Sequence, residues 1–463
     1  MEPYQPDKKE NCGIFGTCGH ESAVDLTYLG LYALQHRGEE SCGLAVSDGG
    51  KIEQLTGMGL VPEVLTGQKL LGLKGNTAIG HVRYSTTGSS ILRNAQPFLV
   101  KHHQFSVSIA HNGNLVNASA LRRDLEKKGS IFHSTMDSEV IMHLIVRSGK
   151  DRVEERIVDA LSLCKGAFSV IFLYGEKVVG VRDPRGIRPL CLGRVGGSYV
   201  LASESCSLDI IDAEYIRDVE PGEMVVLEGA SIRCHKPFQK VPAARCIFEF
   251  IYFSRPDSLI FGDSVYKVRK AFGRQLARQY PVPGADMVIS IPDSGNYAAL
   301  GYAEESGLPF EHGMVRNHYV GRTFIQPTPE MRRHGVKIKL NPIRSVLKGK
   351  KVVVVEDSIV RGTTTRCRVK EIRRAGASEI HMRISCPPIK FPCFYGIDFP
   401  SREELIANEF ETIGEVASSI GVDSLEYLNM EGMLSAVGAD GFCTACFSGE
   451  YPVEPADRGG KDG

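Results

Sequence analysis

The stretch from Lys350 to Thr365, KKVVVVEDSIVRGTTT, constrains the fold more than any other part of the sequence. Val352–Val355 form an unbroken β-branched run, which predicts a strand buried on both faces of a parallel sheet. Two acids, Glu356 and Asp357, follow at the carboxyl end of this strand, where ligands bind in open α/β sheets. The sequence therefore predicts a binding site at this edge of the sheet.

A loop with Gly362 and three hydroxyl groups, Thr363–Thr365, follows the two acids. The next segment, RCRVKEIRRAGA, has apolar residues at helical spacing, so the loop lies at a helix N-terminus, where backbone N–H groups bind phosphate. Carboxylates accept hydrogen bonds from vicinal hydroxyls, so acids beside a phosphate cradle indicate a phosphorylated sugar. The alternative is an ordinary strand, turn and helix with solvated acids, although two acids after a buried strand are unusual.

This order of apolar run, two acids and Gly-Thr-Thr resembles the 5-phosphoribosyl-1-diphosphate (PRPP) loop of type I phosphoribosyltransferases. The resemblance implies that the acids bind the ribose hydroxyls and that the loop holds the 5-phosphate. A second strand and turn, VISIPDSGNY, presents Ser294 to a diphosphate or its Mg²⁺, with a bare turn as the alternative. The implied PRPP and Mg²⁺ site comprises Ser294, Glu356, Asp357, Ser358, Arg361, Gly362, Thr363, Thr364 and Thr365.

Length and composition fit a soluble protein of two or three domains, with 463 residues, 42% hydrophobic and 24% charged. There is no apolar run of about 18 residues, so we expect no membrane span. The formal charge is zero and no basic cluster dominates, so we expect no nucleic-acid partner. The start, MEPYQPDKKEN, lacks a secretory signal, and we expect a cytoplasmic protein. Thirteen cysteines argue against a disulfide framework and leave catalysis, metal binding or burial.

Apolar character begins abruptly at Cys12, in the hexapeptide NCGIFG. We predict that residues 1–11 are a propeptide and that Cys12 becomes the N-terminus. Its α-amine, with a pKa of about 8, could then act as general base for the thiol of the same residue. A buried core cysteine at the start of a strand is the alternative.

Later motifs supply the other groups that hydrolysis of the glutamine amide needs. Arg83 can pair with the α-carboxylate, and Asp137 can hold the α-ammonium. The Asn112 side chain and the Gly113 N–H can form an oxyanion hole. Taken singly, each has an ordinary alternative: a surface cation for Arg83, a helix cap for Asp137 and a hairpin turn for Asn112-Gly113.

The combination resembles the glutaminase domain of class II glutamine amidotransferases from about Cys12 to Pro237. It implies an N-terminal nucleophile (αββα) domain, and between Asp137 and Pro237 the sequence itself reads as strands and turns. The segment DPRGIRPL recurs in this family, and we assign it no catalytic role. A polar stretch at Lys236–Ala244 predicts the boundary between an amidotransferase domain, 12–240, and an α/β phosphoribosyltransferase domain, 241–450, with a doubly wound parallel sheet.

A long polar segment, Thr323–Lys350, precedes the PRPP-like loop and is rich in cations. Loops of this length are usually lids or disordered. Its charge and position favour a lid over an anion, formed with Arg332, Arg333, Lys337, Lys339 and Arg344.

Cys443 and Cys446 have C-x₂-C spacing, and Cys246 and Cys393 bring the set to four. Four thiolates could hold Zn²⁺ or a [4Fe–4S] cluster, or could be buried thiols. The four positions resemble the cluster ligands of the iron–sulfur subgroup of glutamine PRPP amidotransferases, in which this glutaminase domain is fused to this transferase domain. The resemblance implies a [4Fe–4S] cofactor. Residues 451–463 are expected to be a disordered tail.

The resemblance covers nearly the whole chain and implies the first committed step of purine biosynthesis: glutamine, PRPP and water give 5-phosphoribosylamine, glutamate and diphosphate. It also implies a homotetramer that purine nucleotides inhibit. Another class II amidotransferase is one alternative, but those carry sugar isomerase or ATP-dependent synthetase domains. A PRPP-sensing regulator without transferase activity is the other, and the intact glutaminase motifs weigh against it.

Overall fold

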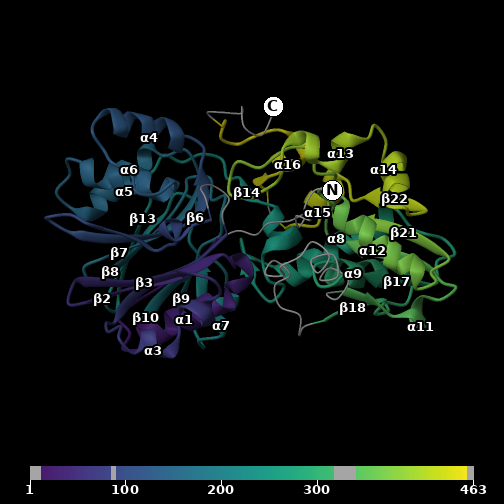
Figure 1. Ribbon diagram of the computed structural model, residues 1–463, viewed down its shortest axis with the longest axis horizontal. Coiled ribbons are helices and arrows are strands. Elements are labelled where there is room, and N and C mark those ends of the chain that lie inside the picture. The colour runs from purple at the N-terminus through teal and green to yellow at the C-terminus, as the bar shows by residue number, and fades with distance from the viewer. Residues whose placement is uncertain (1–11, 85–89, 318–339, 439, 456–463) are drawn as a thin grey trace.

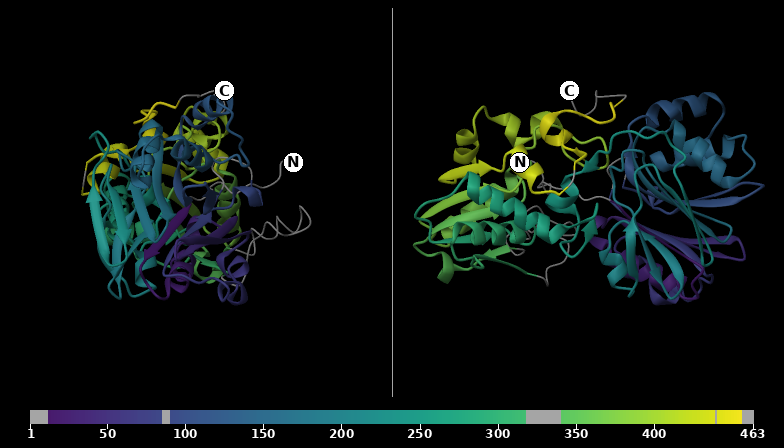
Figure 2. Two further views of the ribbon diagram at one scale, coloured as in Figure 1. Left: turned by 90° about the vertical axis from the view of Figure 1, so that its left-hand side faces the viewer. Right: turned by 180° about the vertical axis from the view of Figure 1, so that it is seen from behind.

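The computed structural model describes residues 12–84, 90–317, 340–438 and 440–455. Two halves lie side by side in Figure 1, the N-terminal half (residues 12–235) in purple to teal and the C-terminal half (residues 245–455) in teal through green to yellow. The right-hand view in Figure 2 shows the same division from behind. A segment without helix or strand, 236–244, joins them, as the polar boundary stretch indicated.

The N-terminal half contains two stacked antiparallel sheets. The seven-stranded sheet has the order β11 (Glu214–Asp218), β9 (Cys191–Val195), β10 (Ser198–Ala202), β1 (Gly13–Cys18), β4 (Thr77–Arg83), β2 (Ser41–Asp48) and β3 (Lys51–Met58). The six-stranded sheet has the order β13 (Ser231–His235), β12 (Met224–Glu228), β8 (Lys177–Arg182), β7 (Gly166–Tyr174), β6 (Ser106–Leu115) and β5 (Phe98–Lys101). Ile14 and Ile79 from the first sheet pack on Ile171 from the second in a shared apolar core.

Helices cover the outer faces of both sheets. The helices and 3₁₀ turns beside the first sheet are α1 (Ala23–Ala33), η1 (Gln35–Arg37), α2 (Val61–Val64), α3 (Gly67–Leu70) and α7 (Cys206–Asp209). Those beside the second sheet are α4 (Ala118–Lys127), α5 (Asp137–Arg147) and α6 (Val153–Leu163). The 3₁₀ turn η2 (Leu92–Asn94) contacts β3 of the first sheet. The four layers confirm the predicted αββα architecture.

Two of these helices correct the expectation of strands and turns after Asp137. In α6, Ile157, Ala160 and Leu161 are buried at helical spacing, so a 3.6-residue period governs this segment. The same holds for α5, which presents Val140, Ile141 and Ile145 to the core. The predicted strands begin only at β7.

The C-terminal half is built on a parallel sheet, which confirms the predicted α/β fold. Its order is β17 (Met287–Ser290), β20 (Lys351–Glu356), β21 (Glu379–Ile384) and β22 (Ser424–Tyr427), all parallel. Val352–Val355 are fully buried, as the β-branched run predicts. The larger helices are α8 (Val265–Gln279), α9 (Asn296–Ser306), α12 (Thr363–Arg374) and α14 (Ile413–Ile420).

Shorter elements complete the C-terminal half. The short strands are β14 (Arg245–Cys246), β15 (Leu259–Ile260), β16 (Asp263–Ser264), β18 (Met314–Arg316), β19 (Leu340–Pro342) and β23 (Phe442–Cys443). The short helical turns are η3 (Glu249–Phe253), α11 (Arg344–Leu347), η5 (Arg402–Glu404), α13 (Ile406–Glu409), α15 (Met430–Ser435) and α16 (Ala445–Ser448). Within the ranges given above, no helix has both the length and the apolar character to cross a membrane.

The expected disordered tail is wrong for residues 451–455. Tyr451 donates a hydrogen bond through its hydroxyl to Pro392 O, 2.7 Å away, and the Val453 N–H donates to the Tyr395 hydroxyl at 3.0 Å. Two aromatic rings with polar tips therefore fix the start of this segment against the body of the protein. The rest of the tail, 456–463, and the predicted propeptide, 1–11, lie outside the described residues.

Candidate active sites and cysteine pocket

Cys12 lies immediately before β1 and is buried. Its thiol donates a hydrogen bond to Tyr84 O at 3.6 Å, and its carbonyl oxygen accepts one from Arg37 Nε at 2.9 Å. Burial raises the pKa of the thiol above its ordinary value, although the Tyr84 hydrogen bond and the charge of Arg83 act in the opposite direction. A thiol in this state needs a nearby base before it can act as a nucleophile.

Four of the predicted glutaminase residues come from distant segments and reach one small pocket. Cys12, Arg83, Gly113 and Asp137 all line it. Arg83 ends β4 with only 3% of its side chain exposed, and its Nη1 lies 3.9 Å from Glu40 Oε2. It is therefore no surface cation, and the pocket lining includes both a cation, Arg83, and an anion, Asp137, as an amino acid zwitterion requires.

Asp137 is the first residue of α5 and is buried. Its Oδ2 accepts a hydrogen bond from the Leu115 N–H at 3.0 Å, and its Oδ1 lies 3.3 Å from His111 Nδ1. Burial disfavours the charged form, but His111 and the N–H donors outweigh it, so the pKa of this carboxyl lies below its ordinary value. The carboxylate is thus available to bind an ammonium group.

Asn112 and Gly113 lie inside β6, paired with Ser169 and Phe168 of β7, so the hairpin alternative is wrong. Gly113 has φ +146°, and a Cβ there would lie 2.1 Å from Ala167 O, so the position requires glycine. Both polar side-chain atoms of Asn112 are buried and lack a hydrogen-bond partner among the described residues. Asn112 is not among the residues that line the pocket, unlike the other four predicted glutaminase residues.

The sequence did not reveal the remaining lining residues, Tyr84, Gln96, His111, Asn114 and Met136. Gln96 Oε1 accepts a hydrogen bond from the His111 N–H at 2.9 Å, which ties the loop before β5 to β6. Tyr84, His111, Asn114 and Met136 had a local signal, because each adjoins a predicted site residue. Gln96 had none and reaches the pocket through loop packing, which no short motif encodes.

The residues predicted for a PRPP site lie at the carboxyl edge of the parallel sheet. Ser294 follows β17 and donates a hydrogen bond from Oγ to Asp357 Oδ1, 2.6 Å away. The Ser358 hydroxyl donates to Asp357 Oδ2 at 2.7 Å. Parallel pairing places Ser290 opposite Val355, so the loops that follow β17 and β20 are neighbours.

Glu356, the first of the two acids, and Arg361 in the loop each have a partner that the sequence did not indicate. Glu356 is paired with Arg368 on α12, and Arg361 Nη2 lies 3.1 Å from Glu404 Oε1. Gly362 caps α12 with φ +73°, and a Cβ would lie 2.4 Å from the Ile406 side chain. The loop therefore needs glycine where it turns into the helix.

The predicted hydroxyls begin this helix. Thr363 is the first residue of α12 and is exposed, whereas Thr364 and Thr365 are buried. Of the predicted lid cations, Arg344 begins α11. The other four, Arg332, Arg333, Lys337 and Lys339, lie outside the described residues.

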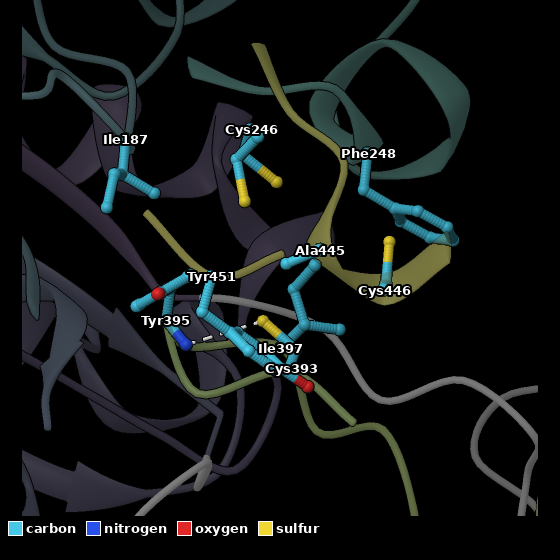
Figure 3. Close-up of a pocket in the computed structure, with 10 residues that line it drawn as sticks. Ile187, Cys246, Phe248, Cys393, Tyr395, Ile397, Ala445, Cys446 and Tyr451 are labelled. Carbon is cyan, nitrogen blue, oxygen red and sulfur yellow. Dashed lines mark hydrogen bonds between the residues drawn. The ribbon is translucent and has the colours of Figure 1, made fainter. Parts of the chain in front are cut away.

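The four cysteines of the predicted cluster line one apolar pocket (Figure 3). β14 and β23 pair in parallel and place Cys246 opposite Cys443, although 197 residues separate them in sequence. Ile187, from the N-terminal half, closes another side. Burial raises the pKa of Cys246 to about 12, and it also raises the pKa values of Cys443 and Cys446.

The pocket does not have the geometry of a single-ion site. Across the residues placed by the structure, no three His, Cys, Asp or Glu side chains are close enough to hold one metal ion. Four thiols around a common apolar space nevertheless fit a larger group that binds each sulfur at a different atom.

Comparisons with known proteins found relatives that match both halves of the chain. A family model described as a glutamine amidotransferase domain matches residues 81–209. Amidophosphoribosyltransferase 2, chloroplastic, from Arabidopsis thaliana is 50% identical over 100% of this chain and 83% of its own length. The amidophosphoribosyltransferases of Bacillus subtilis and Methanocaldococcus jannaschii are 46% and 47% identical, each over 96% of this chain and 94% and 98% of their own.

Solved structures give the same result. The glutamine PRPP amidotransferase from B. subtilis, in complex with ADP and GMP, superposes with a TM-score of 0.91 at 46% identity, covering 96% of this chain and 98% of that one. The agreement extends over both halves and over their arrangement. The chain belongs to the amidophosphoribosyltransferase family.

Proposed function

We propose that this chain releases ammonia from glutamine in the N-terminal half and transfers it to PRPP in the C-terminal half. The product would be 5-phosphoribosylamine, the first committed intermediate of purine biosynthesis, with glutamate and diphosphate released. The observation that carries the proposal is the meeting of Cys12, Arg83, Gly113 and Asp137 in one pocket. Each supplies a different requirement of glutamine hydrolysis.

In the first reaction, Arg83 binds the α-carboxylate of glutamine and Asp137 binds its α-ammonium. The Cys12 sulfur attacks the amide carbon after its proton passes to the α-amine of the same residue. The Gly113 N–H and the Asn112 side chain stabilise the oxyanion. Ammonia leaves with the transferred proton, and water then hydrolyses the thioester to glutamate and the free thiol.

In the second reaction, Glu356 and Asp357 hold the ribose hydroxyls while the N–H groups at the start of α12 hold the 5-phosphate. Bound Mg²⁺ would neutralise the diphosphate as it leaves ribose C1. Ser294 and Asp357 are the candidate groups for this ion and its water ligands. The nitrogen lone pair of ammonia forms the new bond to C1, and a shielded path between the sites keeps ammonia from becoming ammonium in bulk water.

The test separates the two reactions. Purified enzyme is given PRPP with either glutamine or ammonium salt, and glutamate, diphosphate and phosphoribosylamine are measured. The proposal requires product from both nitrogen sources, with glutamate formed in step with glutamine use. Diphosphate release that requires neither nitrogen source would overturn it.

The α-amine can act as base only when residues 1–11 have been removed, so we infer a processed N-terminus at Cys12. Intact mass of active enzyme is the measurement. Full glutaminase activity in a chain that retains Met1 would contradict this inference.

We infer that Cys246, Cys393, Cys443 and Cys446 hold a [4Fe–4S] cluster rather than zinc, with a structural role because the substrates undergo no redox change. The four thiols line one apolar pocket, and four cysteine thiolates are the usual ligands of such a cluster. Anaerobically purified protein should be brown and contain about four iron atoms per chain. Colourless, active protein that contains zinc would exclude the cluster.

We also infer that PRPP binding stimulates the glutaminase. A basic lid drawn over Mg-PRPP would exclude water and complete the second site. Glutamate release should rise markedly when saturating Mg-PRPP is added, and an unchanged rate would show that the two sites are not coupled. Because a relative was solved with ADP and GMP, we propose purine nucleotides as inhibitors. We propose a homotetramer, which light scattering in solution tests.

A further inference from the structure

Four fully buried charged side chains, Arg37, Arg188, Glu204 and Glu249, lie between the two halves. Arg37, Arg188 and Glu204 belong to the N-terminal half, whereas Glu249 begins η3 of the C-terminal half. The two arginines and two glutamates balance in formal charge, and His36 Nε2 also lies 2.8 Å from Glu204 Oε1. Buried charges are tolerated only when they are paired and hydrogen-bonded in this way.

Glu249 is the centre of the cluster because its carboxylate receives four hydrogen bonds. Oε1 accepts from Arg37 Nη2 at 2.9 Å and from Arg188 Nη1 at 3.0 Å. Oε2 accepts from Arg37 Nη1 at 3.0 Å and from the Ser254 hydroxyl at 2.8 Å. The carboxylate is thus held by donors on three sides and presents a fixed fork to the Arg37 guanidinium.

Arg37 connects the fixed Glu249 carboxylate to Cys12, the proposed nucleophile. While both of its terminal nitrogens bind Glu249, its Nε donates to the carbonyl oxygen of Cys12 at 2.9 Å. A planar guanidinium cannot shift one of these contacts without the others. The carbonyl carbon of Cys12 is bonded to Cα, which carries both the α-amine and the CH₂–SH side chain, so its orientation affects the positions of the base and of the nucleophile together.

Arg188 explains the segment DPRGIRPL, to which the sequence assigned no role. It bridges Glu249 and the carbonyl oxygen of Tyr395, which accepts from Arg188 Nε at 3.0 Å. The same segment binds the backbone of the C-terminal half, because the Cys246 N–H donates to Ile187 O at 3.0 Å. The segment therefore attaches the N-terminal half to η3, where Glu249 lies.

We propose that Glu249, held by Arg188, is a positioning residue of the C-terminal half for the nucleophile Cys12, with Arg37 as the connection. The proposal rests on the glutaminase reaction proposed above. It assigns to the domain interface a specific task, which is to set the rate of attack on glutamine. It predicts that loss of Glu249 impairs the thiol without impairing the PRPP site.

The main test is the charge-balanced variant Arg188→Met with Glu249→Gln, which leaves Arg37 paired with Glu204. A displacement of about 1 Å can lower a rate about 10²-fold. We expect a fall of this size in kcat for glutamine hydrolysis, an unchanged KM for glutamine and unchanged synthesis from ammonia. The single variant Arg188→Lys keeps one donor for Glu249. It should therefore keep part of the glutaminase kcat that the double variant loses. The control pair is Arg217→Met with Glu223→Gln, an ion pair at the edge of the N-terminal half.

A second measurement, the reactivity of the Cys12 thiol toward an alkylating reagent, does not depend on glutamine hydrolysis. The rate of Cys12 alkylation by iodoacetamide should change in the Arg188/Glu249 variant, with a shifted pH profile, and should stay unchanged in the control. This result would support the positioning role even if glutamine is not the substrate, whereas the activity of the unmodified enzyme tests the proposed function itself.

Three results would overturn the proposal. The first is an equal fall in glutamine-dependent and ammonia-dependent synthesis, which would indicate a general loss of structure. The second is a loss of bound metal in proportion to activity, which would assign the effect to the cysteine pocket. The third is unchanged kcat and alkylation in folded protein.

Discussion

The two candidate active sites are assembled in opposite ways. The PRPP-like site takes most of its residues from one continuous stretch, Glu356–Thr365, with Ser294 added from the neighbouring strand. The glutamine pocket takes its residues from separate places: the start of β1, the end of β4, the middle of β6 and the start of α5. A phosphate cradle is a local backbone structure, whereas a pocket for a zwitterion needs separated charges on facing elements.

Because the two sites are assembled differently, we expect them to respond differently to amino-acid substitutions. A contiguous loop depends on its own sequence, so substitutions there should act on PRPP alone. The glutamine pocket depends on the packing of two sheets, one helix and, through Arg37 and Glu249, the other half of the protein. Glutamine hydrolysis should therefore also be impaired by substitutions at positions that are distant in sequence from the pocket residues.

The largest expected effect is that of Cys12→Ala, which removes the nucleophile. Glutamine-dependent synthesis and glutamate release should be lost, by about 10³-fold or more, while ammonia-dependent synthesis stays intact. Cys18→Ala is the matched control, since this buried thiol ends β1, the strand that Cys12 directly precedes, and donates to Glu176 O. Equal loss in both variants would mean that the packing of buried thiols around β1, and not the chemistry of Cys12, sets the activity.

Gly113→Ala should come next. The added Cβ would lie 2.1 Å from Ala167 O, and the φ of +146° is unfavourable for alanine, so the N–H of the oxyanion hole must move. Loss of one such donor lowers kcat about 10²–10³-fold. Glutamate release measured at saturating glutamine tests this, with Gly149→Ala as control because nothing lies within 4 Å of its Cβ position. A normal kcat in folded Gly113→Ala would exclude this amide from catalysis.

The same contrast explains what the sequence could predict. The buried strand Val352–Val355, the loop after it and the placement of Ser294 beside Asp357 follow from local patterns and are seen in the structure. Cys12, Arg83, Gly113 and Asp137 were named one by one from motifs, and the structure brings them together.

Contacts between distant segments could not be predicted. Gln96 enters the glutamine pocket, and Arg368 pairs with Glu356, through packing that no local pattern records. The cross-half pair of Arg37 and Glu249 joins residues 212 positions apart. Such buried charges are recognised only when the fold shows that they are paired.

Asp357→Asn tests the PRPP-like site. The substitution keeps the shape but removes the charge that binds Ser294 and Ser358. Hydrogen bonds to a charged group contribute about 1.5–3 kcal/mol, so the KM for PRPP should rise about 10–150-fold while basal glutaminase stays unchanged. Asp286→Asn is the control, because Asp286 accepts from the Lys351 N–H at the opposite end of β20. An equal loss of basal glutaminase would show that the two sites are not independent.

The smallest expected effect concerns stability near the glutamine pocket. Glu139 is buried on α5 and accepts hydrogen bonds from the N–H groups of His133 and Ser134, both at 2.8 Å, and from the Ser134 hydroxyl at 2.6 Å. Burial opposes the charged form, but these donors and His143 outweigh it and lower the pKa of Glu139 to about 2. The carboxylate therefore anchors the loop that leads to Asp137.

Because this pKa is lowered by folding, the stabilisation is fully present above the ordinary glutamate pKa of about 4.3. It should be lost as the pH falls from there toward about 2. Glu139→Gln should lower the free energy of unfolding by about 1–3 kcal/mol at pH 7, and the difference from the unmodified protein should shrink through this window. Denaturant unfolding at a series of pH values measures it. A difference that does not depend on pH would mean that the variant disturbs packing, and that the charge of Glu139 does not hold this side of the glutamine pocket.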